Sequence, residues 1–520
     1  MNRFRQAGRG TALPVGFPRV APSHWGAVVF GATLGILMLA GALRSTLLGV
    51  GLLVGVFTGV LVLSYPAVGM AMLTFLIPLE RLQRFTSDTA TFTISVMRIV
   101  ALMCLAALIL HRIFQKRPLR LDWSMFLYGG YVVLALAGIL HTSDPDGTKR
   151  AIGTILANCL FFFLFLNYFE RPSQIRFMIL IWLAASLLGE AYSVYDWHFG
   201  SGRTGGIVMQ IDPGYGAQSA ANRWSTVWQD RAEWETLGGL SVRRSMGPTS
   251  HAAVYGINMI MTIPFFFYLM SRYRKFWQQA VLILCLALTG YSILLTNTRA
   301  VILMAAGTVL VSLWYGLFKL RKGHMFALVL GFLIILPFIP RDIYNRVLDP
   351  KNYSSERSAA MRVRFAYWKA GLTIFQEHFL LGVGVGNSKV VPEYTRSLSA
   401  EETTVHNIYL QTALECGIIG WLCFFGFVAV IFHAARQAAR WLRDRAEWRE
   451  EHQILTAIQV AMIAVLIFGL QVDVFEFPLK GWWLMATIAI VLHGWARSLR
   501  RQSRPGEVAA PGNLSFAPAT

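Results

Sequence analysis

The sequence predicts an all-α polytopic integral membrane protein with about 12–14 transmembrane helices. Of its 520 residues, 55% are hydrophobic and 14% are charged, and the mean hydropathy is +0.51. Apolar segments of roughly 17–25 residues recur along the chain, and a helix of this length crosses about 30 Å of hydrocarbon. Lys and Arg gather between alternate segments, as they do in cytoplasmic loops. An ordinary soluble protein is therefore excluded.

The N-terminal part begins with a basic stretch, residues 1–24, which we expect to be retained in the cytoplasm because no cleavage-site pattern follows it. An N-terminal transmembrane region over 25–240 follows. Its first three apolar segments are weakly separated and the third is short, so the helix count is given as a range. The predicted helices lie at 25–43, 46–64, 66–80, 94–114, 122–141, 152–169 and 175–196.

The C-terminal part is predicted to contain a catalytic domain over 241–480 and a last transmembrane helix within 481–499. A disordered cytoplasmic tail over 500–520 is expected from its Pro, Gly, Ala and Ser content. The predicted helices lie at 249–271, 278–296, 299–319, 324–340, 407–434, 454–472 and 480–498.

Charge gives an independent prediction of topology. Basic residues occur after the fourth, sixth, eighth, tenth and twelfth helices and at both ends of the chain. Short cytoplasmic loops retain such residues, so we expect both termini in the cytoplasm. This topology and anionic lipid account for most of the net charge of +20, which makes the lipid bilayer an expected partner and nucleic acid not one. The cysteines lie inside apolar segments without metal-ligand spacing.

The same topology places two long loops on the outer, periplasmic face, at about 197–248 and 341–405. The first contains Trp224, Trp228 and Trp234, and it ends in Arg243-Arg244-Ser245-Met246-Gly247-Pro248. Loop tryptophans pack at the membrane interface or stack on sugar rings. Two cations before a helix could hold a phosphate.

The second loop contains Arg362 and Arg364, then Trp368, and then Gly382-Val383-Gly384-Val385-Gly386. Two arginines at alternate positions face one anion only in an extended segment, because in a helix they point about 200° apart. Glycines at alternate positions allow a close backbone approach to a ligand, but they also occur in tight turns.

Three further features concern acids and a cation near the helix ends. Arg299 stands in the short turn Thr296-Asn297-Thr298-Arg299, either as a functional cation or as a snorkelling anchor. Glu190 is an intramembrane acid and a candidate salt-bridge partner. Asp473 lies at the outer end of the thirteenth helix, before Trp482-Trp483, which could mark the membrane interface.

A His-Asn pair, His406-Asn407, opens the twelfth helix. Histidine exchanges protons near neutral pH, so at a membrane face it is a candidate general base. Asn is also favoured at helix starts, and the pair could simply cap the helix.

These pieces, in this order, resemble the superfamily of O-antigen ligases and O-antigen polymerases. The Thr296-Asn297-Thr298-Arg299 turn is similar to its arginine turn, and Arg364, Trp368 and Leu381-Gly382-Val383-Gly384 are similar to the end of its large periplasmic loop. The most specific match is to its His-Asn signature, which resembles His406-Asn407-Ile408-Tyr409-Leu410-Gln411 followed by Glu415, Gly417 and Gly420. Arg244, with Gly247-Pro248, is similar to a further arginine segment, for which Arg243 competes.

The resemblance implies a GT-C-like glycosyltransferase fold in the bacterial inner membrane, with the active site facing the periplasm. It implies inverting transfer of a glycan from an undecaprenyl-diphosphate-linked oligosaccharide donor to a saccharide or lipid A-core acceptor, without a metal or cofactor. His406 would be the general base. Arg299, Arg364 and Arg244 would bind the diphosphate, and Asn407, Trp368, Glu415 and Asp473 would support the site. An O-antigen or exopolysaccharide polymerase and a protein glycan transferase remain alternatives to a ligase.

Two other readings are open. Asp144-Pro145-Asp146-Gly147 is first a turn sequence, but as the Asp-x-Asp of an outer loop it could hold a cation and indicate a metal-dependent polyprenyl-phosphate glycosyltransferase. A transporter or flippase of lipid-linked oligosaccharide would have charges distributed through its helices and internal repeats. Here the arginines gather at outer helix ends instead.

Overall fold

The computed structural model describes residues 46–79, 95–199, 203–209, 224–230, 232–237, 240–249, 251–318, 350–387, 405–472 and 479–502. The chain divides into two units, Met1–Ser64 and Tyr65–Thr520. The first unit contributes the apolar helix α2 (Thr46–Ser64). The predicted helices 25–43 and 324–340 lie outside the described residues.

The second unit is mainly helical. Its N-terminal helices are α3 (Pro66–Leu76), α4 (Val96–Gln115), α5 (Ser124–Ala137), α6 (Pro145–Tyr168) and α7 (Pro172–Phe199), with 3-10 turns η1 (Ile77–Leu79) and η3 (Gly138–Leu140). Its C-terminal helices are α8 (Ala252–Arg272), α9 (Phe276–Leu295), α10 (Arg299–Trp314), α13 (Pro350–Glu377), α15 (Ile408–Leu442), α16 (Arg449–Phe468) and α17 (Lys480–Gln502), with η5 (Ala446–Trp448) before α16.

Among the described residues, seven helices are long and apolar enough to span a membrane. They are Val96–Gln115, Pro145–Tyr168, Pro172–Phe199, Ala252–Arg272, Phe276–Leu295, Ile408–Leu442 and Ala446–Phe468. Four shorter apolar helices accompany them, at Val54–Ser64, Pro66–Leu79, Ser124–Leu140 and Arg299–Trp314. A helical, multi-pass membrane protein is therefore confirmed.

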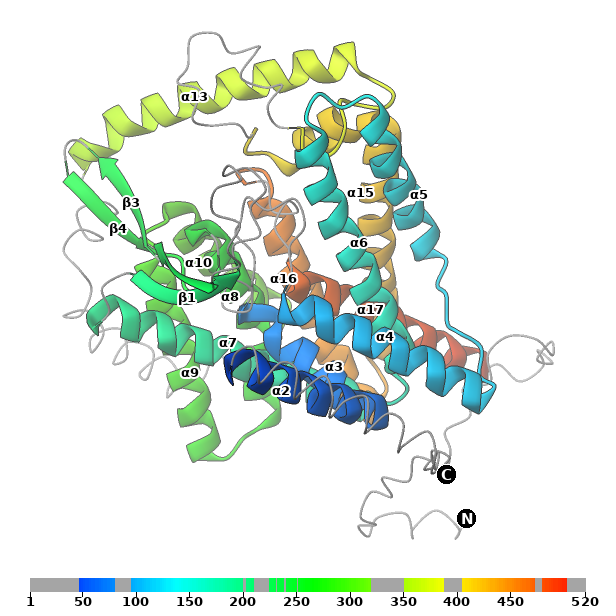
Figure 1. Ribbon diagram of the computed structural model, residues 1–520. Coiled ribbons are helices and arrows are strands. Elements are labelled where there is room, and N and C mark those ends of the chain that lie inside the picture. Colours follow the sequence, from blue (N-terminus) through cyan, green and yellow to red (C-terminus); the bar gives the residue numbers. More distant parts are fainter. Residues whose placement is uncertain are drawn as a thin grey trace, which may run out of the picture. The chain divides into compact units, whose positions relative to one another are not determined.

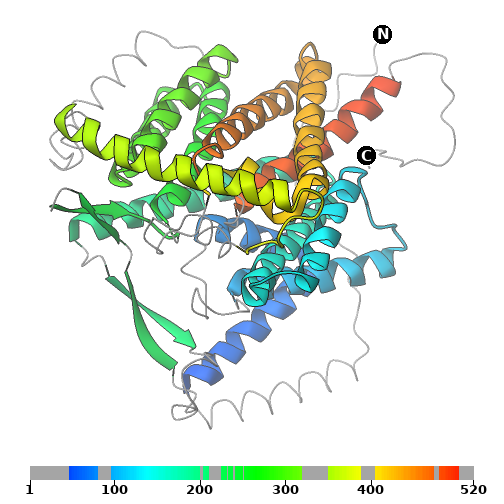
Figure 2. The ribbon, with the colours of Figure 1, turned by 90° about the horizontal axis from the view of Figure 1, so that it is seen from above.

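Helix α8 lies at the centre of one half of the second unit. In its most apolar stretch 94% of the residues are buried, against 33% in α9. A helix that is apolar all round is buried by its neighbours, here α9, α10 and α16. In the other half, α15 packs against α5, α16 and α17 (Figures 1 and 2).

Trp482 and Trp483 belong to this core. Their side chains are 0% and 1% exposed, and Trp483 packs on the rings of Tyr128, Phe162 and Phe427. The expectation that this pair marks the membrane interface is wrong, because α17 lies between α6 and α15 and presents its first turn to them.

Two antiparallel hairpins occupy the predicted loop 197–248, and the all-helical prediction omitted them. Strand β1 (Arg203–Met209) pairs with β2 (Trp224–Asp230), and β3 (Ala232–Leu237) pairs with β4 (Leu240–Ser245). In β3, Glu233, Trp234 and Glu235 alternate, and in β4 Leu240, Ser241 and Val242 alternate. That period of two suits a strand with one covered face.

Ion pairs join the basic connections that were predicted to lie on one side. Glu170, after α6, faces Arg112, Arg117 and Arg120 from the connection between α4 and α5, at 3.3, 3.6 and 3.7 Å. Glu450, before α16, faces Arg176 of α7 at 2.5 Å and Arg272 of α8 at 3.0 Å. In each cluster the predicted cytoplasmic connections meet at one end of the helices, as the charge pattern requires.

Candidate functional site

The arginine turn between α9 and α10 is tightly built. Helix α9 ends at Leu295, Asn297 takes a left-handed conformation with φ 49°, and Thr298 is the N-cap of α10. Asn is one of the few residues that adopts this conformation readily. Arg299 then becomes the first residue of α10, half-buried beside the turn. A three-residue connection thus fixes the cation against the end of α9.

Strand β4 brings Arg244 to the same turn. The Arg244 guanidinium donates a hydrogen bond from Nη2 to Thr298 Oγ1 at 2.8 Å. Its neighbour Arg243 instead pairs with Asp196 Oδ2 at 3.4 Å and lies over the Trp197 ring. Successive residues of a strand point to opposite faces, so only one of the two arginines can reach the turn. Of the two competing arginines, Arg244 is therefore the one that contacts the turn.

Buried polar groups lie beneath this turn. Asn297 is 1% exposed, and neither side-chain polar atom has a hydrogen-bond partner among the described residues. Glu190 accepts a hydrogen bond from Thr289 Oγ1 at 2.8 Å. The expected salt bridge of Glu190 does not occur within the described part of the chain; a hydroxyl on the facing helix α9 takes its place.

The His-Asn pair forms the start of α15. Asn407 is the N-cap, and its Oδ1 accepts from the backbone N–H groups of Tyr409 and Leu410 at 3.0 and 3.2 Å. His406 precedes it with φ 53° and is half-buried. A left-handed histidine costs roughly 1–2 kcal/mol unless its surroundings impose it. Capping therefore explains Asn407 but leaves the conformation of His406 to be explained.

The backbone of Val405 is held on both sides immediately before His406. The Trp368 indole Nε1 of α13 donates to the Val405 carbonyl at 3.1 Å. The Val405 N–H donates to Gln411 Oε1 at 3.4 Å. The Val405 side chain is buried in a cluster with Tyr367, Ile374 and Leu414. These contacts fix the chain direction into His406 and can support its left-handed turn.

Gln411, which accepts from the Val405 N–H, also contacts Glu415. Gln411 Nε2 donates to Glu415 Oε1 at 2.6 Å, and Glu415 is buried. Gln411 thus links Glu415 to Val405. The sequence signature includes Gln411 but assigned it no role, although its position four residues after Asn407 and four before Glu415 places all three on one helix face.

The glycine segment packs against a kink in α15. Gly417 is non-helical within α15, with φ 62°. At the kink, the Leu414 and Glu415 carbonyls have no helical hydrogen-bond donor. They accept instead from the N–H groups of Val383 and Gly384, at 3.0 and 2.9 Å. The glycines therefore allow a close approach of backbone to backbone here, rather than forming a ligand loop.

Arg364 lies on α13, beside the cluster that holds Val405, and its side chain is half-buried. Residues 362–364 are helical, so the extended segment that a shared anion site would need does not occur here. Helix α13 runs across the start of α15 (Figures 1 and 2). Trp368 lies one turn after Arg364 on α13 and packs against the cluster that contains Val405.

Two predicted acidic features differ in outcome. Asp473 lies outside the described residues. Asp144 is the N-cap of α6, and its Oδ1 accepts from the Gly147 N–H at 3.3 Å. Asp144-Pro145-Asp146-Gly147 is therefore a turn at the helix start, as its sequence first indicates. Within the described ranges, no group of three or more His, Cys, Asp or Glu residues is placed to hold a metal.

The contacts collect the predicted residues into two groups. Arg244 contacts Thr298 in the turn that leads into Arg299. Where α13 packs on α15, Trp368 bonds the backbone of Val405, next to His406, and Gln411 links Val405 to Glu415. Segments predicted to be periplasmic contribute both groups. The described part of the chain is thus a multi-pass helical membrane protein with cations and an imidazole at helix ends.

Comparison with protein families identifies the region. Residues 282–425 match the family model described as O-antigen ligase, which confirms the predicted resemblance over this part of the chain. The match includes Arg299, Arg364, Trp368, His406, Asn407 and Glu415, and excludes Arg244. No curated protein matches the chain.

Proposed function

We propose that this protein is an inner-membrane glycosyltransferase of the ligase or polymerase type. It transfers a glycan from an undecaprenyl-diphosphate-linked donor to a saccharide or lipid A-core acceptor on the periplasmic side, without a metal and with inversion. One observation carries the proposal: the O-antigen ligase region contains Arg299 and His406, and Arg244 is hydrogen-bonded to the turn that presents Arg299.

The arginines suit the leaving group. As the bond between the anomeric carbon and the diphosphate oxygen breaks, negative charge develops on the diphosphate. Guanidinium groups bind such oxygens with paired N–H donors and stay charged at any physiological pH. Arg299 and Arg244 offer two cations at one turn, and Arg364 offers a third on α13.

His406 suits the acceptor. Its imidazole takes the proton of the acceptor hydroxyl while that oxygen attacks the anomeric carbon, and the displaced diphosphate leaves on the carrier. A base in this role contributes typically 10²–10⁴-fold to the rate. The contacts of Val405 and Asn407 on either side of His406 would hold the ring in one position during this step.

The test distinguishes the loss of the His406 imidazole from a disturbance of the left-handed backbone at residue 406. His406→Asn removes the imidazole but keeps a residue that accepts φ 53°, whereas His406→Ala also strains the backbone. His433→Asn, at an exposed position near the other end of α15, is the matched control. Immunoblotting checks insertion, and envelope polysaccharide and carrier-linked intermediates are profiled against a deletion strain.

We expect His406→Asn to abolish the product while His433→Asn retains it. Accumulation of carrier-linked single repeats would identify a polymerase. Persistence of carrier-linked long chains without the lipid A-linked ladder would identify a ligase. A normal profile for His406→Asn, with the protein inserted, would overturn the general-base role and leave His406 as part of the helix start.

A further inference from the structure

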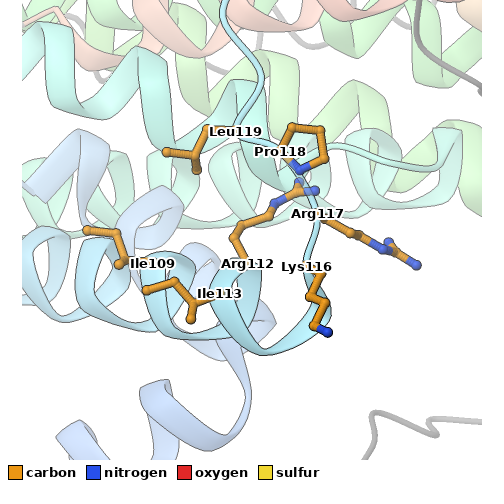
Figure 3. Close-up of a pocket in the computed structure, with 7 residues that line it drawn as sticks. All are labelled: Ile109, Arg112, Ile113, Lys116, Arg117, Pro118 and Leu119. Carbon is orange, nitrogen blue, oxygen red and sulfur yellow. The ribbon is translucent and has the colours of Figure 1, made fainter. Parts of the chain in front are cut away.

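A pocket opens at the C-terminal end of α4, in the cluster of connections predicted to face the cytoplasm. Its volume is about 390 Å³, and Figure 3 shows the seven lining side chains: Ile109, Arg112, Ile113, Lys116, Arg117, Pro118 and Leu119. The apolar side chains Ile109, Ile113 and Leu119 lie on one side, and the ends of Lys116 and Arg117 lie on the other. The lining is therefore amphipathic.

The end of α4 builds this pocket. Lys116 is the C-cap and has φ 50°, a conformation usually taken by glycine. The Arg117 N–H reaches back to the Arg112 carbonyl at 3.1 Å, and the chain turns into Pro118. A lysine at a glycine position places a cation at the rim where glycine would place none.

Positive charge exceeds negative charge around this pocket. Arg112, Arg117 and Arg120 share the carboxylate of Glu170. Arg112 is 9% exposed and also donates to the Asn167 carbonyl at 2.8 Å, so its donors are used within the protein. Arg117 and Lys116 are exposed and direct their charge outward. An anion that enters the pocket would meet these two cations.

The apolar wall is equally exposed. Ile113 is 66% exposed, Ile109 42% and Leu119 46%. The isoleucines lie in the last two turns of a helix long and apolar enough to span the membrane. Acyl chains reach this depth of a bilayer, while a soluble anion would leave the apolar wall in contact with water.

We propose that this pocket binds the headgroup of an anionic phospholipid of the host membrane. Lys116 and Arg117 contact the phosphodiester, and the upper acyl chain packs on Ile109, Ile113 and Leu119. Basic pockets beside transmembrane helices recognise lipid headgroups through this combination of charge and apolar surface. The site stands apart from the arginine turn and the His-Asn pair, and it does not depend on the proposed glycan transfer.

Native mass spectrometry of the full-length protein in neutral detergent tests this site. Phosphatidylglycerol, phosphatidylcholine and inorganic phosphate are added separately. The variant Lys116→Gln/Arg117→Gln is compared with Arg274→Gln/Lys275→Gln, which removes the same charge from exposed residues of the connection between α8 and α9.

We expect the wild type to retain phosphatidylglycerol over phosphatidylcholine. The pocket variant should bind it on the order of 30-fold more weakly, at roughly fivefold per cation, and the control variant should not change. Equal retention by both variants, or equal retention of the two lipids, would overturn the proposal. Binding of inorganic phosphate that displaces the lipid completely would replace it with a soluble-anion site.

A second variant guards against a folding effect. Lys116→Gly removes the cation while supplying the residue that the left-handed C-cap prefers, so α4 should keep its end. Weaker phosphatidylglycerol binding with an unchanged unfolding temperature is the expected result. Full lipid binding by Lys116→Gly would exclude the lysine from the site.

Discussion

Arg243 and Arg244 are adjacent in the sequence but serve opposite faces of β4. Arg243 is paired with Asp196, and both side chains are less than one-fifth exposed. Arg244 contacts Thr298, in the turn that leads into Arg299. The sequence offers two equivalent cations at this place. Only the register of the hairpin, in which Glu233 faces Arg244 and Trp234 faces Arg243, distinguishes them.

This distinction predicts different losses for the two arginines. Arg244→Gln should lower glycan transfer by roughly 10–10³-fold with little change in the unfolding temperature, because it removes a charged donor from the turn. Arg243→Gln should lower stability by roughly 1–3 kcal/mol, since Asp196 loses its partner, and retain transfer per folded molecule. Thermal unfolding in detergent and product assays at equal protein check both. The reverse pattern would move the substrate contact to Arg243.

At the scale of elements, hydropathy and capping chemistry account for what could be predicted. Length and apolar content placed α4, α7, α8 and α9 close to their bounds. Helix α6 begins at Pro145 rather than 152, because Asp144 caps a polar first turn that hydropathy does not detect. The hairpins were not predicted because their strands are short and lie outside the hydrophobic runs that hydropathy detects.

The candidate site divides in the same way. The order of the motifs selected His406, Arg299 and Arg364, because an imidazole and guanidinium groups suit the proposed chemistry. It did not reveal that Val405 is held through its backbone, because a backbone hydrogen bond leaves no mark on the identity of the residue that makes it. The kink at Gly417 was likewise not predicted, since a glycine inside an apolar run is also compatible with a regular helix.

The kink predicts contrasting effects of two glycines in the same helix. A Cβ at Gly417 would lie 2.2 Å from the Leu380 carbonyl oxygen, at φ 62°. A Cβ at Gly426 would meet only Leu127, at 3.8 Å. Gly417→Ala should therefore destabilise the protein by more than about 2 kcal/mol. Gly426→Ala should be neutral or stabilise by up to about 1 kcal/mol.

Thermal unfolding of both variants in one detergent measures the contrast. Equal unfolding temperatures would show that α15 can straighten at Gly417 without loss, and the backbone contacts from Val383 and Gly384 would then not depend on the kink.

At the scale of the whole molecule, the polar contacts separate into two ends. Ion pairs of Glu170 and Glu450 join the predicted cytoplasmic connections. Contacts at the other end join predicted periplasmic segments, such as Ser143 with Asn387. Helix α6 runs between them, and its 24 residues extend about 36 Å. The two sets of connections therefore lie at opposite ends of α6, as the predicted topology requires.

This arrangement predicts sidedness. A membrane-impermeant maleimide added to intact cells permeabilised only at the outer membrane should label Asp146→Cys, and should label Arg274→Cys only after the inner membrane is opened. Both positions are exposed, and the native cysteines lie within the helices. Wild-type protein gives the background. Labelling of Arg274→Cys in unopened cells would invert the proposed orientation.

The junction of α13 with α15 connects the segments that carry two candidate site residues. The indole of Trp368, the buried cluster around Val405 and the backbone bonds from Val383 and Gly384 join these segments. Arg364 lies on the first segment, and His406 lies just before the second. In the proposed glycan transfer, their separation would be set when the chain folds, and the substrate would meet charges that do not have to be reorganised at each turnover.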